Sequence, residues 1–157
     1  IPVCKMALRT HSSTAVEKYS QKAADKCVPL DSELIKEAIP LFTQIHHCGS
    51  VLAEVFFAMM ISRILYGSVP APGTMLIFSI LLATCSIGTP GLPWGTVMVS
   101  LGTLTGILKF GDSGMALMFA VFALNDAFAA ACNATCDGAA ALFLTGYVKR
   151  HDFSNRL

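Results

Sequence analysis

The C-terminal part of the chain is a long apolar stretch that carries three regularly spaced polar residues. Positions 115–148 are mostly Ala, Phe, Leu, Val and Met, and Asp126, Asn133 and Asp137 interrupt them. At 100° per residue, offsets of 7 and 11 positions return to within about 20° of the same helix face. An ionised carboxylate in hydrocarbon costs at least ~3 kcal/mol, so such residues usually line a binding path. The pattern therefore predicts one helix over 113–149 with a substrate or ion site on one face.

Two shorter apolar pieces, 75–86 and 96–108, precede that helix and flank the Gly- and Pro-rich segment 87–95. Each piece is about a dozen residues long, whereas a membrane-spanning helix needs ~20. Irregular backbone at membrane depth is tolerated only where protein buries it or where it lines a cavity. We therefore expect a re-entrant hairpin over 72–108. The alternative is a pair of ordinary core helices joined by a surface loop.

The N-terminal part of the chain predicts an interrupted series of helices. An amphipathic pattern covers 15–27 and stops at Pro29. Asp31 and the following serine can cap a new helix that runs through Leu41. The polar segment 44–50 interrupts this helix before a second apolar helix over 51–66. The whole of 31–66 is therefore interpreted as one broken helix.

Composition and charge indicate a membrane protein. The chain is 54% hydrophobic and only 13% charged, about half the charge fraction of soluble domains. Of its 21 charged residues, 11 lie in 1–40 and only 6 in 41–148. We expect 41–148 to be embedded in the membrane. A net charge of +1 without a basic, aromatic-interleaved patch gives no support for nucleic-acid binding.

Taken together, these patterns predict an all-α membrane protein. Its expected features are two re-entrant helical hairpins, a broken helix and a long helix with a polar stripe. Broken helices and intramembrane polar stripes are typical of secondary transporters, where interrupted helices expose backbone groups to ions and substrate near the midplane. No nucleophile–base pair or phosphate-binding loop appears in the sequence, and we do not expect an enzyme.

The order of these motifs resembles the dicarboxylate/amino-acid:cation symporter family, the glutamate/aspartate transporters. In that family a serine-tipped hairpin, a broken helix, a second hairpin and a polar last helix form the C-terminal transport domain. The corresponding stretches here are 10–15, 44–50, 86–93 and 133–137. The resemblance implies a first re-entrant hairpin over 1–28. It also implies cation-coupled symport of a small carboxylate or amino acid in the inner cell membrane by a multi-pass protein.

Carried over residue by residue, the resemblance implies a substrate site and sodium sites. Ser12 and Ser13 would hold the substrate carboxylate, and Asp126 would bind its amino group. Asn133 would serve both substrate and cation, and Asp137 would be the charged sodium ligand. A further set from the broken helix and the second hairpin would contribute to cation or substrate binding: His46, Ser86, Ile87, Thr89 and Gly91.

The chain departs from the family pattern at several of these positions. The Asn-Met-Asp-Gly-Thr motif of the broken helix is 46–50 here, with His46 in place of Asn and Cys48 in place of Asp. His46 would let a proton replace one sodium, because histidine exchanges a proton near neutral pH. The arginine of acidic-substrate transporters is Ala129 or Ala130, so no bidentate partner awaits a second carboxylate. The first-tip arginine is His11.

Two further interpretations stay open at this point. The chain begins at Ile1, so we expect the family's N-terminal scaffold, and with it the homotrimer, to lie outside this sequence. One alternative is accordingly a truncated or diverged membrane interaction subunit that does not transport. The other is a transition-metal binder, since imidazole and thiolate suit zinc or copper; its ligands would be His46, Cys48, Cys132 and Cys136.

Overall fold

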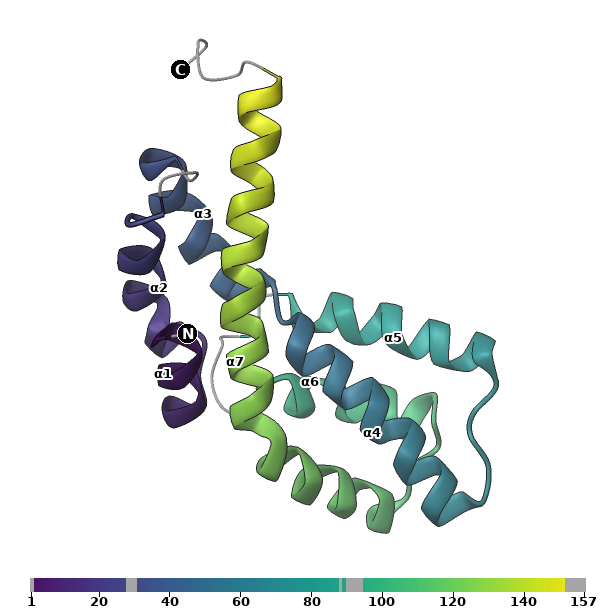
Figure 1. Cartoon of the computed structure of the whole chain (residues 1–157). Helices are drawn as coiled ribbons and strands as arrows, with labels where there is room; N and C mark the ends of the chain where they lie inside the picture. Colours follow the sequence, from purple (N-terminus) through teal and green to yellow (C-terminus); the bar gives the residue numbers. More distant parts are fainter. Residues whose placement is uncertain (1, 28–30, 88, 90–94, 152–157) are drawn as a thin grey trace.

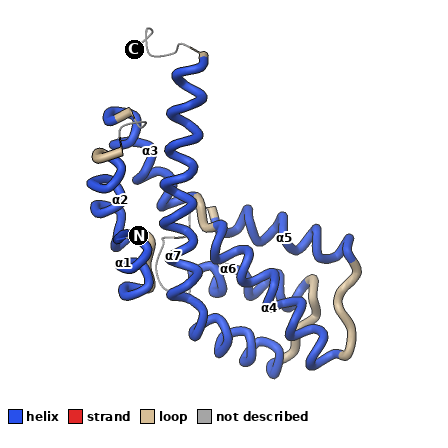
Figure 2. The backbone as a smooth tube through the Cα atoms, in the orientation of Figure 1, coloured by secondary structure: helices blue, strands red, loops and turns tan. Residues whose placement is uncertain are grey.

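The computed structural model describes residues 2–27, 31–87, 89 and 95–151, and every regular element in that part is helical. This confirms the all-α prediction, and Figure 2 shows the helices joined by short loops. The elements in chain order are α1 (Pro2–Thr10), the 3-10 turn η1 (Thr14–Val16), α2 (Glu17–Ala24), α3 (Ser32–Ile45), α4 (Cys48–Tyr66), α5 (Pro72–Ser86), α6 (Gly95–Gly106) and α7 (Asp112–Arg150).

The long helix α7 is the axis on which the other helices assemble. It changes direction part-way along its length, so that its first part and its remainder form two arms (Figure 1). Helices α1, α2 and α3 lie along the C-terminal arm, and α4, α5 and α6 lie beside the N-terminal arm (Figure 1). The predicted helix over 113–149 thus extends by one residue at each end.

The broken helix forms because α3 and α4 are separated by two residues in non-helical conformations. The Asp31 side chain accepts hydrogen bonds from the backbone N–H groups of Glu33 and Leu34, which confirms the predicted cap. His46 has φ −108° and ψ 83°, and His47 has φ −102° and ψ 41°. The interruption therefore lies inside the predicted segment 44–50 but is shorter, since α3 runs on to Ile45 and α4 starts at Cys48.

Two helix–turn–helix units correspond to the predicted hairpins. The chain turns from α1 through η1 into α2, and α5 packs beside α6. Helices α5 and α6 have 15 and 12 residues, too few for either to span a bilayer alone. The tip between them lies largely outside the described residues, and Gly91 is among those not described. Insertion of either unit as a re-entrant hairpin stays a prediction.

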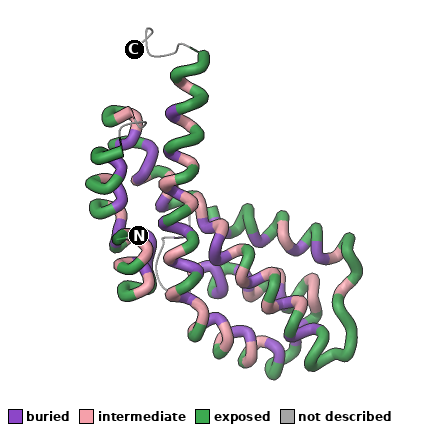
Figure 3. Tube along the Cα trace, in the orientation of Figure 1, coloured by how far each residue is buried: buried purple, intermediate pink, exposed green. Residues whose placement is uncertain are grey.

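The largest apolar core joins α4, α5 and α6 to the first part of α7. We call it the hairpin core, and its central members are Phe78, Leu82, Val97, Leu104 and Phe122. All five are at most 1% exposed. Buried residues recur along one side of each helix, with exposed ones opposite (Figure 3).

Many outward-facing side chains are large and apolar, as expected of a protein surrounded by lipid. Leu124 is 82% exposed, Phe143 78% and Leu52 73%. Exposed apolar surface on this scale marks an interaction surface or a membrane contact. Within the described residues, the helical stretches 32–66 and 112–150 are long and apolar enough to cross a membrane.

Candidate functional site

The polar stripe on α7 is buried where the two arms of the helix meet the other elements. Asp126 is 5% exposed, Asn133 3% and Asp137 0%. The spacing that puts them on one helix face therefore turns all three inward. Ala129 and Ala130 are also buried on α7, so no guanidinium stands one turn after Asp126.

The turn after α1 lies against the first residue of the stripe. Its His11 adopts a left-handed φ of 55°, and the His11 Nδ1 atom lies 3.9 Å from Asp126 Oδ2. Ser12 and Ser13 follow directly and are both buried. The Ser12 hydroxyl accepts a hydrogen bond from the Ala15 backbone N–H at 3.2 Å. The serine-rich segment and Asp126 thus belong to one neighbourhood.

Asn133 caps the start of α4 from across the helix pair. Its Oδ1 accepts hydrogen bonds from the backbone N–H groups of Gly49 at 2.7 Å and Ser50 at 3.3 Å, and its Nδ2 donates to Ser50 Oγ at 2.9 Å. The first N–H groups of a helix have no intrahelical acceptor, so this amide satisfies two of them. A β-carbon at Gly49 would stand 2.5 Å from Cys132 Cβ and 2.7 Å from the Ala129 carbonyl oxygen. Only glycine permits this approach.

Asp137 pairs with the break in the helix but keeps one carboxylate oxygen open. His46 Nδ1 lies 3.2 Å from Asp137 Oδ1. Within the described residues, Asp137 Oδ2 is buried and has no hydrogen-bond partner. The carbonyls at the end of a helix lack intrahelical donors, and α3 ends just before His46, whose own N–H donates to the Phe42 carbonyl. A fully buried carboxylate oxygen with open acceptor capacity beside a helix C-terminus fits an alkali cation, which prefers oxygen ligands.

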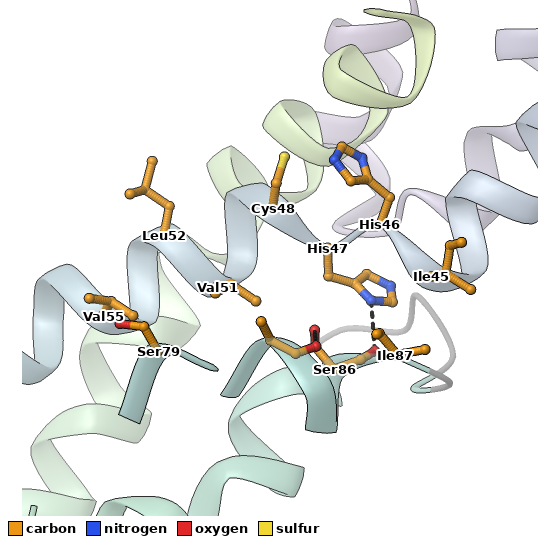
Figure 4. A pocket seen from close by; sticks show the side chains of 11 residues that line it. Ile45, His46, His47, Cys48, Val51, Leu52, Val55, Ser79, Ser86 and Ile87 are labelled. Atoms are coloured by element: carbon orange, nitrogen blue, oxygen red, sulfur yellow. Dashed lines mark hydrogen bonds between the residues drawn. The ribbon is translucent and has the colours of Figure 1, made fainter. Parts of the chain in front are cut away.

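The second hairpin meets the break through the end of α5. His47 Nδ1 donates to the Ser86 carbonyl oxygen at 3.1 Å (Figure 4). The same oxygen accepts from the Thr89 backbone N–H at 3.2 Å and from Thr89 Oγ1 at 2.6 Å. Three donors thus occupy a carbonyl predicted as a sodium ligand. The predicted ligand Ile87 has a side chain that is 59% exposed.

A cleft of ≈ 610 Å³ separates the break and α4 from α5. His47 points across it toward Ser86 and Ile87, whereas His46 and Cys48 point to the other side of the break (Figure 4). Neighbouring histidines therefore serve different partners: His46 contacts α7 and His47 contacts the second hairpin.

The transition-metal interpretation is wrong for the part of the chain that the structure describes. No group of three or more His, Cys, Asp or Glu side chains there is arranged to hold a metal ion. The predicted set fails because His46 is directed to Asp137, while Cys132 is exposed on α7. Two remaining thiols do not complete a tetrahedral zinc site.

Sequence reasoning missed Glu54, a carboxylate of α4 that lies nine positions before Arg63 on the same helix. Glu54 is fully buried, and neither of its carboxylate oxygens has a hydrogen-bond partner among the described residues. Arg63 instead donates to the Gly67 carbonyl oxygen at 2.8 Å. The buried positions of α4 include Ser50, Glu54 and Ala58, so the four-residue spacing was the signal that pointed to it.

Comparison with known proteins gives one match. A family model described as the sodium:dicarboxylate symporter family matches residues 1–146. No curated protein and no solved structure matches.

Proposed function

Because this chain belongs to the sodium:dicarboxylate symporter family, we propose that it binds a small carboxylate or amino acid together with a cation and moves both across a membrane. The family consists of membrane transporters that couple dicarboxylate movement to sodium, not of enzymes. The finer features below are those of this chain: where its substrate and its cation bind, and how the two are coupled.

The observation that supports the proposal best is the convergence of four separate motifs on the middle of α7. We call this the polar junction, and its members are His11, His46, His47, Gly49, Ser50, Ser86, Asp126, Asn133 and Asp137. The turn after α1 meets Asp126, the start of α4 meets Asn133, and His46 meets Asp137. His47 joins the end of α5 to the same place. A junction of helix ends with buried carboxylates is the arrangement that broken-helix transporters use to bind ions and substrate.

The cation would bind at Asp137. This carboxylate is fully buried, and its Oδ2 has no hydrogen-bond partner in the described part of the chain. In that same part of the chain, His46 Nδ1 is the hydrogen-bond partner of the opposite oxygen. A proton on His46 would compensate part of the Asp137 charge, so we propose that sodium and a proton compete to neutralise this carboxylate.

The substrate would lie between the first tip and the stripe. Ser12 and Ser13 would hold a carboxylate, and Asp126 would bind an amino group. Thr89 would close the site from the second tip. Asn133 Nδ2 donates a hydrogen bond to Ser50, so this group would bind substrate only after giving up that bond. With alanine at 129 and 130, we propose a monocarboxylate or a neutral amino acid over one with an acidic side chain.

Coupling would follow from the burial of Asp137. If the second hairpin closed over substrate alone, an uncompensated carboxylate would remain in a site of low dielectric, which costs several kcal/mol. A bound cation removes that cost. Closure, and therefore transport, would then require both ligands. A scaffold domain and a homotrimer, as the family resemblance implies, would hold this mobile unit in the inner membrane.

To test this, the protein is reconstituted into proteoliposomes with an inward gradient of sodium or, as the control, of choline. Uptake is then measured for radiolabelled carboxylates, neutral amino acids and acidic amino acids. We expect accumulation of at least one neutral amino acid or monocarboxylate that depends on sodium. Accumulation that is equal in sodium and choline would contradict the proposal.

A second function, a non-transporting membrane subunit, is favoured by a specific observation. The Asn133 amide already donates a hydrogen bond to Ser50, and Thr89 already donates one to the Ser86 carbonyl. These groups of the junction therefore have hydrogen-bond partners without a ligand. For such a subunit, neither uptake nor sodium-dependent ligand binding is expected with any compound of the series.

A further inference from the structure

The turn that follows α1 places a histidine beside a carboxylate of the polar junction. His11 Nδ1 lies 3.9 Å from Asp126 Oδ2, and the His11 side chain is 46% exposed whereas that of Asp126 is 6% exposed. We propose that His11 determines the class of substrate at Asp126: as an imidazolium it favours a monocarboxylate without an amino group, and as a neutral imidazole it favours a neutral amino acid. This inference rests on the proposed function, because it needs a substrate that binds at Asp126.

The packing of α1 on α7 fixes His11 at this place. The buried side chain of Ala7 on α1 packs in one cluster with Ala130 and Ala134 of α7, so α1 lies against the part of α7 that follows Asp126. The His11 backbone N–H donates to the Ala7 carbonyl oxygen at 2.9 Å, and the φ of His11 is 55°. This left-handed conformation is unfavourable for most residues with a β-carbon. Such backbone strain is concentrated at binding and active sites.

The charged groups around His11 pair it with Asp126. Helix α1 packs against α7, η1 and α2. Within the described residues of these elements, Asp126 is the acidic side chain at ion-pair distance from His11. Glu17 on α2 accepts a hydrogen bond from α3, and the basic residues of α1, Lys5 and Arg9, are exposed. His11 and Asp126 therefore form one titratable pair.

Neither α7 nor the second tip supplies a permanent positive charge to this pair. The positions one turn after Asp126 are alanines, and the basic residues of α7 lie at its C-terminal end. Segment 87–95 carries no ionisable side chain. Asp137, the next carboxylate of the stripe, contacts His46. Because histidine exchanges a proton near neutral pH, the positive charge that the first tip brings to Asp126 depends on pH.

The charge balance of the closed site then selects the substrate. A buried carboxylate without a cation is unfavourable, and so is a buried cation without an anion. The ammonium group of an amino acid neutralises Asp126 when the imidazole is neutral, but it adds a second positive charge when the imidazole is protonated. A monocarboxylate brings no cation, so the protonated imidazole must neutralise Asp126. Ser12 and Ser13, which directly follow His11, would hold the substrate carboxylate in both cases.

The experiment compares each amino acid with the acid that lacks only its amino group. The pairs are alanine with propionate, valine with isovalerate and phenylalanine with hydrocinnamate. Their dissociation constants are measured on the full chain in lipid nanodiscs with excess sodium, at pH 6 and pH 8. The ratio of the two constants of a pair cancels any effect of pH on sodium binding that both ligands share. We expect the preference for the amino acid to rise about 10-fold from the lower to the higher pH.

Two variants assign this effect to His11. Asparagine tolerates the left-handed conformation but cannot be protonated, so His11→Asn should show the preference that the wild type has at the higher pH, at both pH values. Lysine carries a lasting positive charge, and Lys109 shows that this chain accommodates lysine at a φ of 57°. His11→Lys should therefore keep the preference that the wild type has at the lower pH. His151→Asn, directly after α7 and exposed, is the matched control and should follow the wild type.

Failure of this inference is distinguishable from failure of the proposed function. If the ligands bind but their ratio is the same at both pH values, or if its pH dependence is unchanged in the two His11 variants, the inference is overturned and the proposed function stands. If no ligand of either class binds at either pH, the proposed function fails and the inference fails with it. The two variants carry opposite predictions, so either one that folds by circular dichroism decides alone.

Discussion

The polar junction and the hairpin core are neighbours on α7, yet they are held together by different forces. In the hairpin core, Phe78, Leu82 and Phe122 pack as fully buried apolar side chains. In the junction, hydrogen bonds such as those of His46 with Asp137 and of Asn133 with Gly49 also join the elements. Packing over a large apolar area tolerates small shifts, whereas a hydrogen-bonded pair is either made or lost.

This difference separates stability from function. Loss of a large apolar group from the hairpin core leaves a cavity and weakens the whole fold. A change in the junction removes one specific partner and leaves most of the packing in place. The comparison therefore predicts that core variants lower stability in proportion to lost volume. Junction variants should change cation dependence at nearly constant stability.

The largest effect on cation binding is expected from Asp137→Asn, which keeps the side-chain shape but removes the buried charge. Apparent sodium affinity should fall by about 100-fold, equivalent to about 3 kcal/mol. The measurement is uptake or substrate binding as a function of sodium concentration. Asp112→Asn, at the exposed start of α7, is the matched control and should behave as the wild type. An unchanged sodium response in Asp137→Asn would contradict the proposal that the cation binds at Asp137.

The largest effect on stability is expected in the hairpin core. Phe122→Ala should lower the free energy of unfolding by about 4 kcal/mol, because the lost ring leaves a cavity among α4, α5 and α6. Phe128→Ala is the control on the same helix, since Phe128 is 62% exposed, and it should change stability little. Thermal unfolding in lipid nanodiscs measures both. Equal destabilisation by the two variants would contradict the burial of Phe122 in the hairpin core and the exposure of Phe128.

Gly49→Ala tests the place where the two regions touch. The added β-carbon would clash with the Ala129 carbonyl oxygen and with Cys132 Cβ, so α4 must move away and lose the Asn133 cap. We expect a loss of about 2 kcal/mol in stability and weaker sodium dependence. Gly102→Ala on α6 has no atom within 4 Å of its new β-carbon and should be neutral or stabilising. A fully stable Gly49→Ala variant would contradict the close crossing.

The smallest effect is expected from His46→Gln. In the wild type, a proton at the His46–Asp137 pair would oppose sodium binding at the same carboxylate. Glutamine keeps a hydrogen-bond donor but cannot carry the charge of an added proton, so the pH dependence of the sodium response should differ from that of the wild type. Sodium titrations of substrate binding at pH 6 and pH 8 measure this. A pH profile in His46→Gln that is the same as in the wild type would assign the proton to another group.

The sequence predicts the features of this fold that depend on local chemistry. The Asp31 cap, the interruption near His46 and the inward face of α7 all follow from helix propensity, capping and period. The polar stripe also identified Asp126, Asn133 and Asp137, three of the buried polar residues of α7. These predictions rest on signals carried by residues that are close in the chain.

Features that depend on how helices cross could not be predicted in this way. Asn133 caps α4 from 84 positions away, and the Ser86 carbonyl accepts a hydrogen bond from His47 in the break between α3 and α4. Nothing local to either residue indicates such a partner. Glu54 is an intermediate case, because the spacing of Ser50, Glu54 and Ala58 contained the signal and charge alone argued against it.

One measurement tests the central claim most directly: the substrate dissociation constant at increasing sodium concentrations, for the wild-type protein and for Asp137→Asn, in the same membrane preparation. The account predicts that sodium tightens substrate binding to the wild type, that substrate tightens sodium binding by the same factor, as linkage requires, and that Asp137→Asn abolishes both. A sodium-independent dissociation constant for the wild type, or equal sodium dependence in the two proteins, would contradict it.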